Sequence, residues 1–433
     1  MDTRKIVVPS SRPDISEDDI ARVAETLRSG WITTGPRVRE FEAALAAWLD
    51  APHVVCLNSA TAGMELILRA LGIGPGDEVI TTVYTYAATA NIAAHTGARA
   101  VLVDTLPGDF AIDPQAVASA LTPRTKAIIP VDFAGWPCAY AALSKAVNEY
   151  AARAGFAPSN PWQEVFGRPV ILADAAHSLG SRYDGERVSR YCDFAVYSFH
   201  AVKNLTTAEG GAVVFHSNPF EKAGGSAGEF ARALRLLALH GQTKDAFAKE
   251  QAGSWEYDIE VCGYKHNMTD IQAALGIGQL ARYDANLARR RVIAERYAAG
   301  LEDARFIHPL WARGGACAGA GTEGGMGSGG GTSAGTEGDG IPRESSYHIY
   351  PLRLAGYGLE QRNALIARLA AAGIAANVHF KPLPLFTAWK NSCRMEDYPR
   401  AYAHYVREMT LPLWPGMTEE QIDWVIAKCI EFA

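Results

Sequence analysis

Two residues of this chain, Asp174 and Lys203, have side chains suited to the chemistry of carbanions, and each follows a short apolar run. A lysine amine can attach a carbonyl compound as an imine and can afterwards carry a proton. A carboxylate can keep a pyridine nitrogen protonated, so that the ring withdraws electrons from a neighbouring carbanion. Each residue also has an ordinary explanation, because most lysines are exposed surface residues and an Asp after a strand often caps the next turn.

Other residues that could hold pyridoxal phosphate (PLP) occupy similar places along the sequence. The segment Asn58–Gly63 lies between a predicted strand and a predicted helix, where free N–H groups and hydroxyls could bind a phosphate. Ser198 ends another apolar run, so its hydroxyl could reach the same phosphate. Tyr86 opens a further helix and could stack on a pyridine ring. Helix capping and core packing are the ordinary explanations for these residues.

These residues are positioned by short apolar runs that alternate with helical patterns between residues 54 and 215. The runs predict strands at Val54–Leu57, Glu78–Thr82, Ala100–Val103, Ala127–Val131, Val170–Ala173, Phe194–Ser198 and Ala212–Phe215. Such alternation is typical of an α/β fold with a mainly parallel sheet and helices on both faces. Ligands of such sheets bind beyond the carboxyl ends of the strands. The candidate residues follow strands, so we expect one site at this edge.

The rest of the chain predicts a connecting segment and a second, smaller α+β domain. We expect an N-terminal arm and a large domain over residues 1–268, a helical connection over 269–312, a Gly-rich insertion over 313–343 and a C-terminal domain over 344–433. Gly314–Gly340 contains 13 glycines in 27 residues. Its apolar groups are too few to offset the entropy lost on ordering, so the segment predicts a flexible insertion. Pro158–Pro169 resembles a second, smaller insertion. In the C-terminal domain we expect a strand at His348–Leu354, a helix at Leu359–Ala372 and a strand near Asn377–Phe380.

Composition excludes several classes of function. The chain has 433 residues, 48% of them hydrophobic, and a formal net charge of −6, and it contains no Lys/Arg block typical of nucleic-acid binding. The sequence predicts no signal peptide and no membrane span. Its seven cysteines are scattered without a CxxC pair, which argues against a disulfide framework or a zinc site and favours the cytoplasm.

Longer motifs give a more specific indication than single residues. They are SGWITTGP (29–36), SATAGM (59–64), GDEVIT (76–81), TPRTKAIIPV (122–131), DAAHSLG (174–180), SFHAVKNLTTAEGGAVV (198–214), GYKHNMTDIQAALGIGQL (263–280) and VHFKPLP (378–384). In these motifs and their order the sequence resembles the DegT/DnrJ/StrS family of sugar aminotransferases, which have the fold-type I architecture of PLP enzymes. Within the family it is most similar to the UDP-4-amino-4-deoxy-arabinose synthase type.

The resemblance implies PLP-dependent amino transfer from an amino acid, glutamate, to a keto group of a nucleotide-linked deoxy sugar, for the synthesis of amino sugars, polysaccharides or glycans. It implies a homodimer, no metal, and a partner-subunit contact to the cofactor phosphate from Asn267. The cofactor roles that it implies are attachment by Lys203, a pyridine-nitrogen contact by Asp174, a phenolic-oxygen contact by His177, phosphate binding by Ala60, Thr61 and Ser198, and ring stacking by Tyr86. It places the substrate near Trp31, Thr33, His379 and Lys381.

Other functions stay open at this stage. The same family includes enzymes that transaminate a keto-cyclitol. It also includes PLP-dependent sugar dehydratases, but these carry His where this chain has Lys203. A non-catalytic regulatory relative is a third alternative, disfavoured because Lys203, Asp174, Ser198 and Tyr86 are all present. The two insertions have no counterpart in the family pattern and leave the substrate open.

Overall fold

The computed structural model describes residues 6–222, 224–244, 255–312 and 339–433. Its centre is a seven-stranded sheet in the order β1-β9-β8-β5-β4-β2-β3. Neighbouring strands are parallel, except that β9 runs antiparallel to both β1 and β8. The strands are β1 (His53–Leu57), β2 (Glu78–Thr82), β3 (Arg99–Val103), β4 (Thr125–Ile129), β5 (Val170–Asp174), β8 (Phe194–Ser198) and β9 (Gly211–Phe215). Each overlaps a predicted strand, and the predicted fold class is confirmed.

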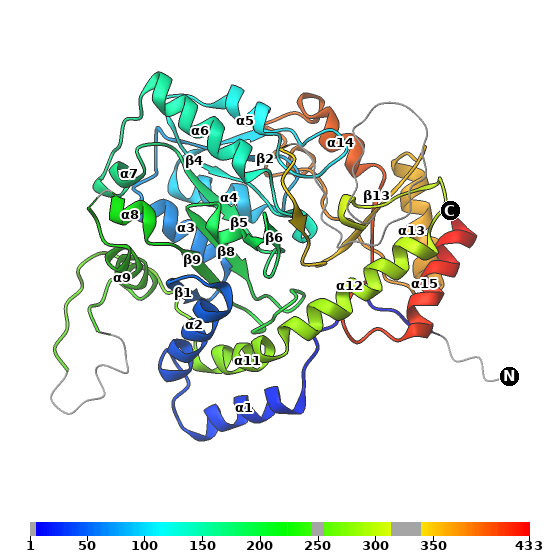
Figure 1. Cartoon of the computed structure of the whole chain (residues 1–433), viewed down its shortest axis with the longest axis horizontal. Helices are drawn as coiled ribbons and strands as arrows, with labels where there is room; N and C mark the ends of the chain where they lie inside the picture. The colour runs from blue at the N-terminus through cyan, green and yellow to red at the C-terminus, as the bar shows by residue number, and fades with distance from the viewer. Residues whose placement is uncertain (1–5, 223, 245–254, 313–338) are drawn as a thin grey trace.

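Helices cover both faces of this sheet because successive residues of each strand point to opposite sides. In β5, Ile171 and Ala173 belong to one hydrophobic core, whereas Val170 and Leu172 belong to the other. The first core is closed by α2 (Pro36–Leu49), α5 (Pro114–Ala120), α6 (Tyr140–Ala154) and α11 (Asp270–Ala281). The second is closed by α3 (Ala60–Ala70), α4 (Ala88–Thr96), α7 (Pro161–Phe166), α8 (Asn218–Lys222) and α9 (Ala227–Ala238). Figure 1 shows these helices around the sheet.

The segment Pro158–Pro169, expected to be a small insertion, contains helix α7 and packs against the second core. Asn160 caps α7 by accepting a hydrogen bond from the Gln163 N–H, and the Gln163 side chain is buried. The Trp162 ring packs 5.2 Å from that of Phe230. Two aromatic residues of α7, Trp162 and Phe166, thus fill part of the second core, and this burial holds the helix in place.

The segment expected to be a helical connection contains two consecutive helices, α11 and α12 (Tyr283–Gly300), which are separated only at Arg282. Helix α12 leads to a second sheet in the order β10-β12-β13, and it packs against α15 (Glu419–Phe432). The strands are β10 (Phe306–Ile307), β12 (Tyr350–Leu354) and β13 (Glu408–Leu411); α13 (Leu359–Ala371) and α14 (Pro399–Tyr405) complete this part. No described helix has both the length and the apolar character needed to cross a membrane.

The strand expected near Asn377–Phe380 does not form. Asn377 makes a single bridge to Thr410 of β13, and the chain then leaves the sheet. Most of the Gly-rich insertion, residues 313–338, lies outside the described residues. Its C-terminal end is packed: Arg343 is fully buried and ion-pairs with Asp339, and β11 (Arg343–Glu344) joins β6 (Arg182–Tyr183) and β7 (Glu186–Arg187) in a small sheet.

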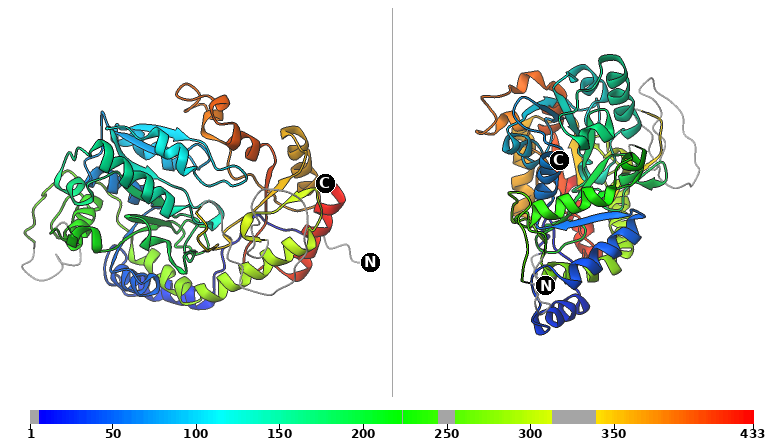
Figure 2. Two further views of the ribbon diagram at one scale, coloured as in Figure 1. Left: turned by 45° about the horizontal axis from the view of Figure 1, so that its top comes forward. Right: turned by 90° about the vertical axis from the view of Figure 1, so that its left-hand side faces the viewer.

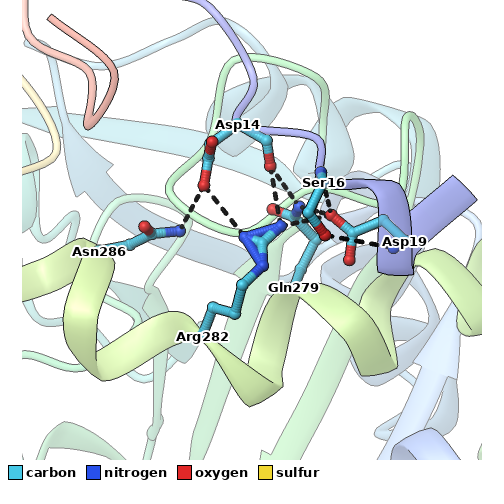
Figure 3. Close-up of polar contacts among 6 residues, drawn as sticks. All are labelled: Asp14, Ser16, Asp19, Gln279, Arg282 and Asn286. Atoms are coloured by element: carbon cyan, nitrogen blue, oxygen red, sulfur yellow. Dashed lines mark hydrogen bonds and ion pairs between the residues drawn. The ribbon is translucent and has the colours of Figure 1, made fainter.

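The N-terminal helix α1 (Glu17–Arg28) packs along α11, as the left view of Figure 2 shows. The guanidinium of Arg282 ion-pairs with Asp14 and with the buried Asp19, and it does so at the break between α11 and α12. Gln279 donates a second hydrogen bond to Asp19, at 2.9 Å. Figure 3 shows this network, which also includes Ser16 and Asn286. The network attaches residues 14–19 to the two helices that connect the sheets.

Candidate active site

The turn between β1 and α3 forms one end of the candidate site. The hydroxyl of Ser59 caps α3 by accepting a hydrogen bond from the Ala62 N–H at 3.1 Å. The N–H groups of Ala60 and Thr61 point out of the first turn and have no acceptor among the described residues. Ser198, at the end of β8, lines one cavity together with Ala60 and Thr61. Free N–H groups at a helix N-terminus, together with hydroxyls, suit a phosphate.

Asp174 lies at the carboxyl end of β5 and is buried. Its Oδ2 accepts a hydrogen bond from the Thr89 hydroxyl at 2.7 Å, and its Oδ1 accepts one from the Ala176 N–H at 3.2 Å. Burial raises the pKa of Asp174, while Thr89, Ala176 and Lys203 act in the opposite direction. A buried carboxylate in this position favours a cationic partner such as a protonated pyridine nitrogen.

Lys203 lies in the turn after β8, where its N–H donates to the His200 carbonyl. Burial lowers the pKa of the Lys203 amine to about 8, although the charge of Asp174 favours the protonated form. A pKa near 8 leaves a usable fraction of neutral amine near neutral pH, and only the neutral amine is a nucleophile. The structure therefore places an activated amine and a buried carboxylate in the lining of one cavity.

His177 follows Asp174 at the floor of the site. Its Nδ1 accepts a hydrogen bond from the Ala134 N–H at 3.3 Å, so the proton of the neutral ring is on Nε2. Burial lowers the pKa of His177 well below its usual value, and the nearby Lys203 acts in the same direction. His177 is therefore a neutral imidazole that can donate a hydrogen bond from Nε2.

Sequence reasoning missed four residues of the site. Thr89, in the first turn of α4, and Thr85, which precedes the helix, support Asp174, and the hydroxyl spacing after β2 was the available signal. Asn204, next to Lys203, donates to the Ser346 carbonyl at 2.8 Å and lies 2.9 Å from Nδ1 of His348. The His348 ring packs 4.2 Å from that of His177. Nothing in the sequence connects residues 204 and 348, which lie in different parts of the chain.

One cavity of about 480 Å³ collects most of the predicted site residues. They are Ala60, Thr61, Tyr86, Asp174, His177, Ser198, Lys203 and His379. Tyr86 is 67% exposed, which puts its ring at the rim. Carboxylate, amine and phosphate-binding groups are thus distributed along one cavity, and this donor set fits PLP.

Four predicted residues do not line this cavity. The Lys381 ammonium lies over the Phe386 ring, and the Trp31 indole donates to the Thr34 carbonyl at 3.3 Å. Thr33 precedes Thr34 in the same loop, and Asn267 donates to the Thr34 hydroxyl at 2.6 Å. Within the described ranges, no cluster of three or more His, Cys, Asp or Glu side chains is arranged to hold a metal ion.

Together, the sheet and the cavity define a PLP-dependent transferase of fold type I. The model of the DegT/DnrJ/EryC1/StrS aminotransferase family matches residues 13–314 and 331–430, and the chain belongs to this family.

Similar proteins agree with this assignment. A Streptococcus pneumoniae protein named as a sugar aminotransferase, Spr1654, is 45% identical in its PMP form, with a TM-score of 0.86 over 97% of this chain and 98% of that one. The spore coat polysaccharide biosynthesis protein SpsC of Bacillus subtilis is 34% identical over 98% of this chain and 96% of its own. Helicobacter pylori PseC, an aminotransferase of pseudoaminic acid biosynthesis, is 25% identical, with a TM-score of 0.78 and 99% of both chains covered. The protein is therefore a sugar aminotransferase that uses PLP.

Proposed function

We propose that this enzyme transfers an amino group from glutamate to the keto group of a nucleotide-linked deoxy sugar. The observation that carries the proposal is the convergence of Lys203, Asp174 and the N-terminus of α3 on one cavity. These groups match the amine, the carboxylate and the phosphate site that PLP-dependent transamination needs.

In the proposed arrangement, the N–H groups of Ala60 and Thr61 and the hydroxyl of Ser198 hold the cofactor phosphate. Asp174 holds a proton on the pyridine nitrogen, and His177 donates a hydrogen bond to the phenolic oxygen. When bound, PLP supplies the electron sink that stabilises a carbanion at the carbon losing its proton. The remaining chemistry belongs to the chain.

Lys203 is the proposed acid and base. Its amine removes the α-proton of the donor amino acid in the first half of the reaction and returns a proton to the sugar carbon in the second. A pKa of about 8 suits both directions, because neither form of the amine is rare near neutral pH. Asp174 has its carboxylate held by Thr89 and Ala176, so it keeps its place while Lys203 exchanges protons.

We also propose a homodimer with shared sites. Asn267 does not line the cavity of its own chain but lies in the same loop as the exposed Lys265. The adjoining segment exposes apolar side chains, with Trp255 77% and Ile259 49% exposed. A second copy would cover such residues. The partner's cofactor phosphate is the proposed ligand of Asn267.

The test is an assay of the purified protein with PLP, glutamate and a panel of 3-keto and 4-keto sugar nucleotides, followed by mass detection of the amino sugar and of 2-oxoglutarate. We expect the wild-type enzyme to form both products in equal amounts from at least one sugar nucleotide. The Lys203→Ala variant should form neither product. Turnover of a keto-cyclitol with no turnover of any sugar nucleotide would overturn the proposed substrate class. Turnover with alanine or glutamine but not glutamate would overturn only the donor.

A further inference from the structure

His379 is held on three sides and leaves one ring nitrogen free. The backbone N–H of His379 donates to Glu408 Oε2 at 2.9 Å, and its backbone carbonyl accepts from the Tyr84 hydroxyl at 2.8 Å. Its ring Nδ1 lies 2.9 Å from the Thr410 hydroxyl. Its Nε2 has no hydrogen-bond partner among the described residues, and His379 lines the same cavity as Lys203. The free nitrogen is therefore available to a ligand.

Behind His379, Thr410 and Glu408 continue the hydrogen-bond chain into the interior. The hydroxyl of Thr410 hydrogen-bonds to Glu408 Oε1. Both residues belong to β13, where Glu408 is 0% and Thr410 4% exposed. The Thr410 backbone is fixed by two hydrogen bonds with Asn377, at 2.8 and 3.0 Å. The three side chains thus form a fixed relay from a buried carboxyl group to the cavity.

The number of protons in the relay decides the tautomer of His379. When Glu408 is ionised, it can only accept, so Thr410 donates to it and must accept from Nδ1–H of His379. The lone pair of the neutral ring is then on Nε2. When Glu408 is protonated, its Oε2 still accepts from the backbone N–H of His379, so the acid proton is on Oε1 and points to Thr410. The hydroxyl then donates to Nδ1, and the ring proton moves to Nε2.

We propose that Glu408 and Thr410 are positioning residues that set which ring nitrogen of His379 carries its proton, and thereby whether Nε2 accepts or donates a hydrogen bond to an oxygen of the keto sugar. The inference rests on the proposed function, since it requires the sugar to bind in this cavity. His177, by contrast, is fixed as a donor at Nε2 by the Ala134 N–H. The polarity of the His177 ring is therefore fixed, whereas that of the His379 ring can change.

The charged and titratable neighbours favour such a change near neutral pH. Burial raises the pKa of Glu408 to about 8, against the effects of Thr410, the His379 N–H and the Arg362 guanidinium. Burial, and then the charge of Lys203, lowers the pKa of His379 to about 4, so its ring stays neutral. His177 and His348 are the other imidazoles near His379, and both have pKa values lowered well below the usual value by burial. Tyr84, which faces the same segment, has a pKa raised well above its usual value by burial. Glu408 is thus the group whose charge changes within the working range.

The experiment measures the tautomer of His379 directly, without substrate. The PLP-loaded enzyme is labelled with ¹⁵N-histidine, and the His379 signals are assigned by their loss in His379→Asn. We expect the wild-type ring to change from Nε2–H below about pH 8 to Nδ1–H above it. Glu408→Gln must direct its amide N–H₂ toward Thr410, so the ring should keep Nε2–H at every pH. A wild-type tautomer that is independent of pH, or a Glu408→Gln ring that still changes with pH, would overturn the proposal.

Two matched variants separate the relay from a general effect on folding. Thr410→Val removes the hydroxyl at nearly constant volume and should abolish the pH-dependent change, whereas Thr410→Ser retains the hydroxyl and should restore it.

If the sugar contacts Nε2, Glu408→Gln should change KM for the keto sugar by about 3- to 10-fold, the effect of one hydrogen bond, and leave KM for glutamate unchanged. An equal change in both KM values would overturn the assignment to the sugar. The ring measurement succeeds or fails regardless of which substrate the enzyme uses.

Discussion

The hydroxyl of Thr89 lies 2.7 Å from Oδ2 of Asp174, and the Thr85 hydroxyl lies 2.8 Å from that of Thr89. A hydroxyl has a single proton, so Thr89 donates to the carboxylate and accepts from Thr85. Helix α4 thereby orients a carboxylate that belongs to strand β5. The two hydroxyls hold the carboxylate in place.

Asp174→Asn should retain PLP but lower kcat by at least about 100-fold, or about 2.7 kcal/mol of barrier, because an amide does not hold the pyridine nitrogen protonated. The measurement is a single turnover with glutamate, followed by absorbance of the cofactor. Thr89→Ser keeps the supporting hydroxyl and should be nearly normal, whereas Thr89→Val should fall between. Near-normal turnover of Asp174→Asn would mean that Asp174 only caps the turn after β5.

Lys203→Ala should abolish transamination and covalent attachment of PLP without loss of stability. The Lys203 side chain lines an open cavity and is not part of the packed core. Its removal should therefore change the free energy of unfolding by no more than about 0.5 kcal/mol. Lys145→Ala is the matched control, because Lys145 is exposed and forms a surface ion pair with Glu149 at 3.8 Å, away from the cavity. Full activity in Lys203→Ala would remove Lys203 from the mechanism.

The pKa of Lys203 can be tested through the uptake of PLP by the apoenzyme. Only the neutral amine attacks the aldehyde, so the rate of covalent attachment should rise with pH and level off above about pH 8. A lysine with its ordinary pKa would give a rate that continues to rise toward about pH 10.4. Binding of pyridoxamine phosphate, which has no aldehyde, provides the control for the ionisation of the other groups. A midpoint near the ordinary value would show that burial does not activate Lys203.

The close contact between α1 and α11 gives a prediction about stability. A Cβ at Gly278 would overlap Oδ1 of Asp19, the buried partner of Arg282. Gly278→Ala should therefore destabilise the protein by about 1–3 kcal/mol, measured as a lower Tm. Gly228→Ala in α9 is the control, because its nearest neighbour would be 3.5 Å away and Ala favours a helix by up to about 1 kcal/mol. Equal effects of the two substitutions would show that α1 does not pack on α11 in solution.

Shared active sites predict recovery of activity when two inactive variants are mixed. Lys203→Ala lacks the amine, and Asn267→Asp adds a negative charge next to the partner's cofactor phosphate. After subunit exchange, one site of each heterodimer has both defects and the other has neither, so activity should reappear. Mixing Lys203→Ala with Asp174→Asn is the control, since both defects affect a subunit's own site and no normal site can form. Absence of recovery despite exchange confirmed by mass would exclude a shared site.

The sequence by itself determined the large sheet and the edge at which the site lies. Apolar periodicity is a local property, and it predicted each strand to within a few residues. The order of Ala60, Asp174, Ser198 and Lys203 after these strands was therefore enough to predict that they meet. Regular α/β topology brings the carboxyl ends of parallel strands to one edge, whatever the loops contain.

Only the tertiary structure decided which distant residues complete the site. The contacts of Asn204 with His348 and of Tyr84 with the His379 carbonyl depend on how the small sheet packs against the large one, and no local pattern encodes that packing. The same limit explains why Asn377–Phe380, predicted to be a strand, leaves β13 after one bridge. It also explains why the sequence did not show that Trp162, within Pro158–Pro169, packs against the second core. Periodicity specifies which face of an element is apolar, whereas the partner that covers this face is chosen by the packing of the whole chain.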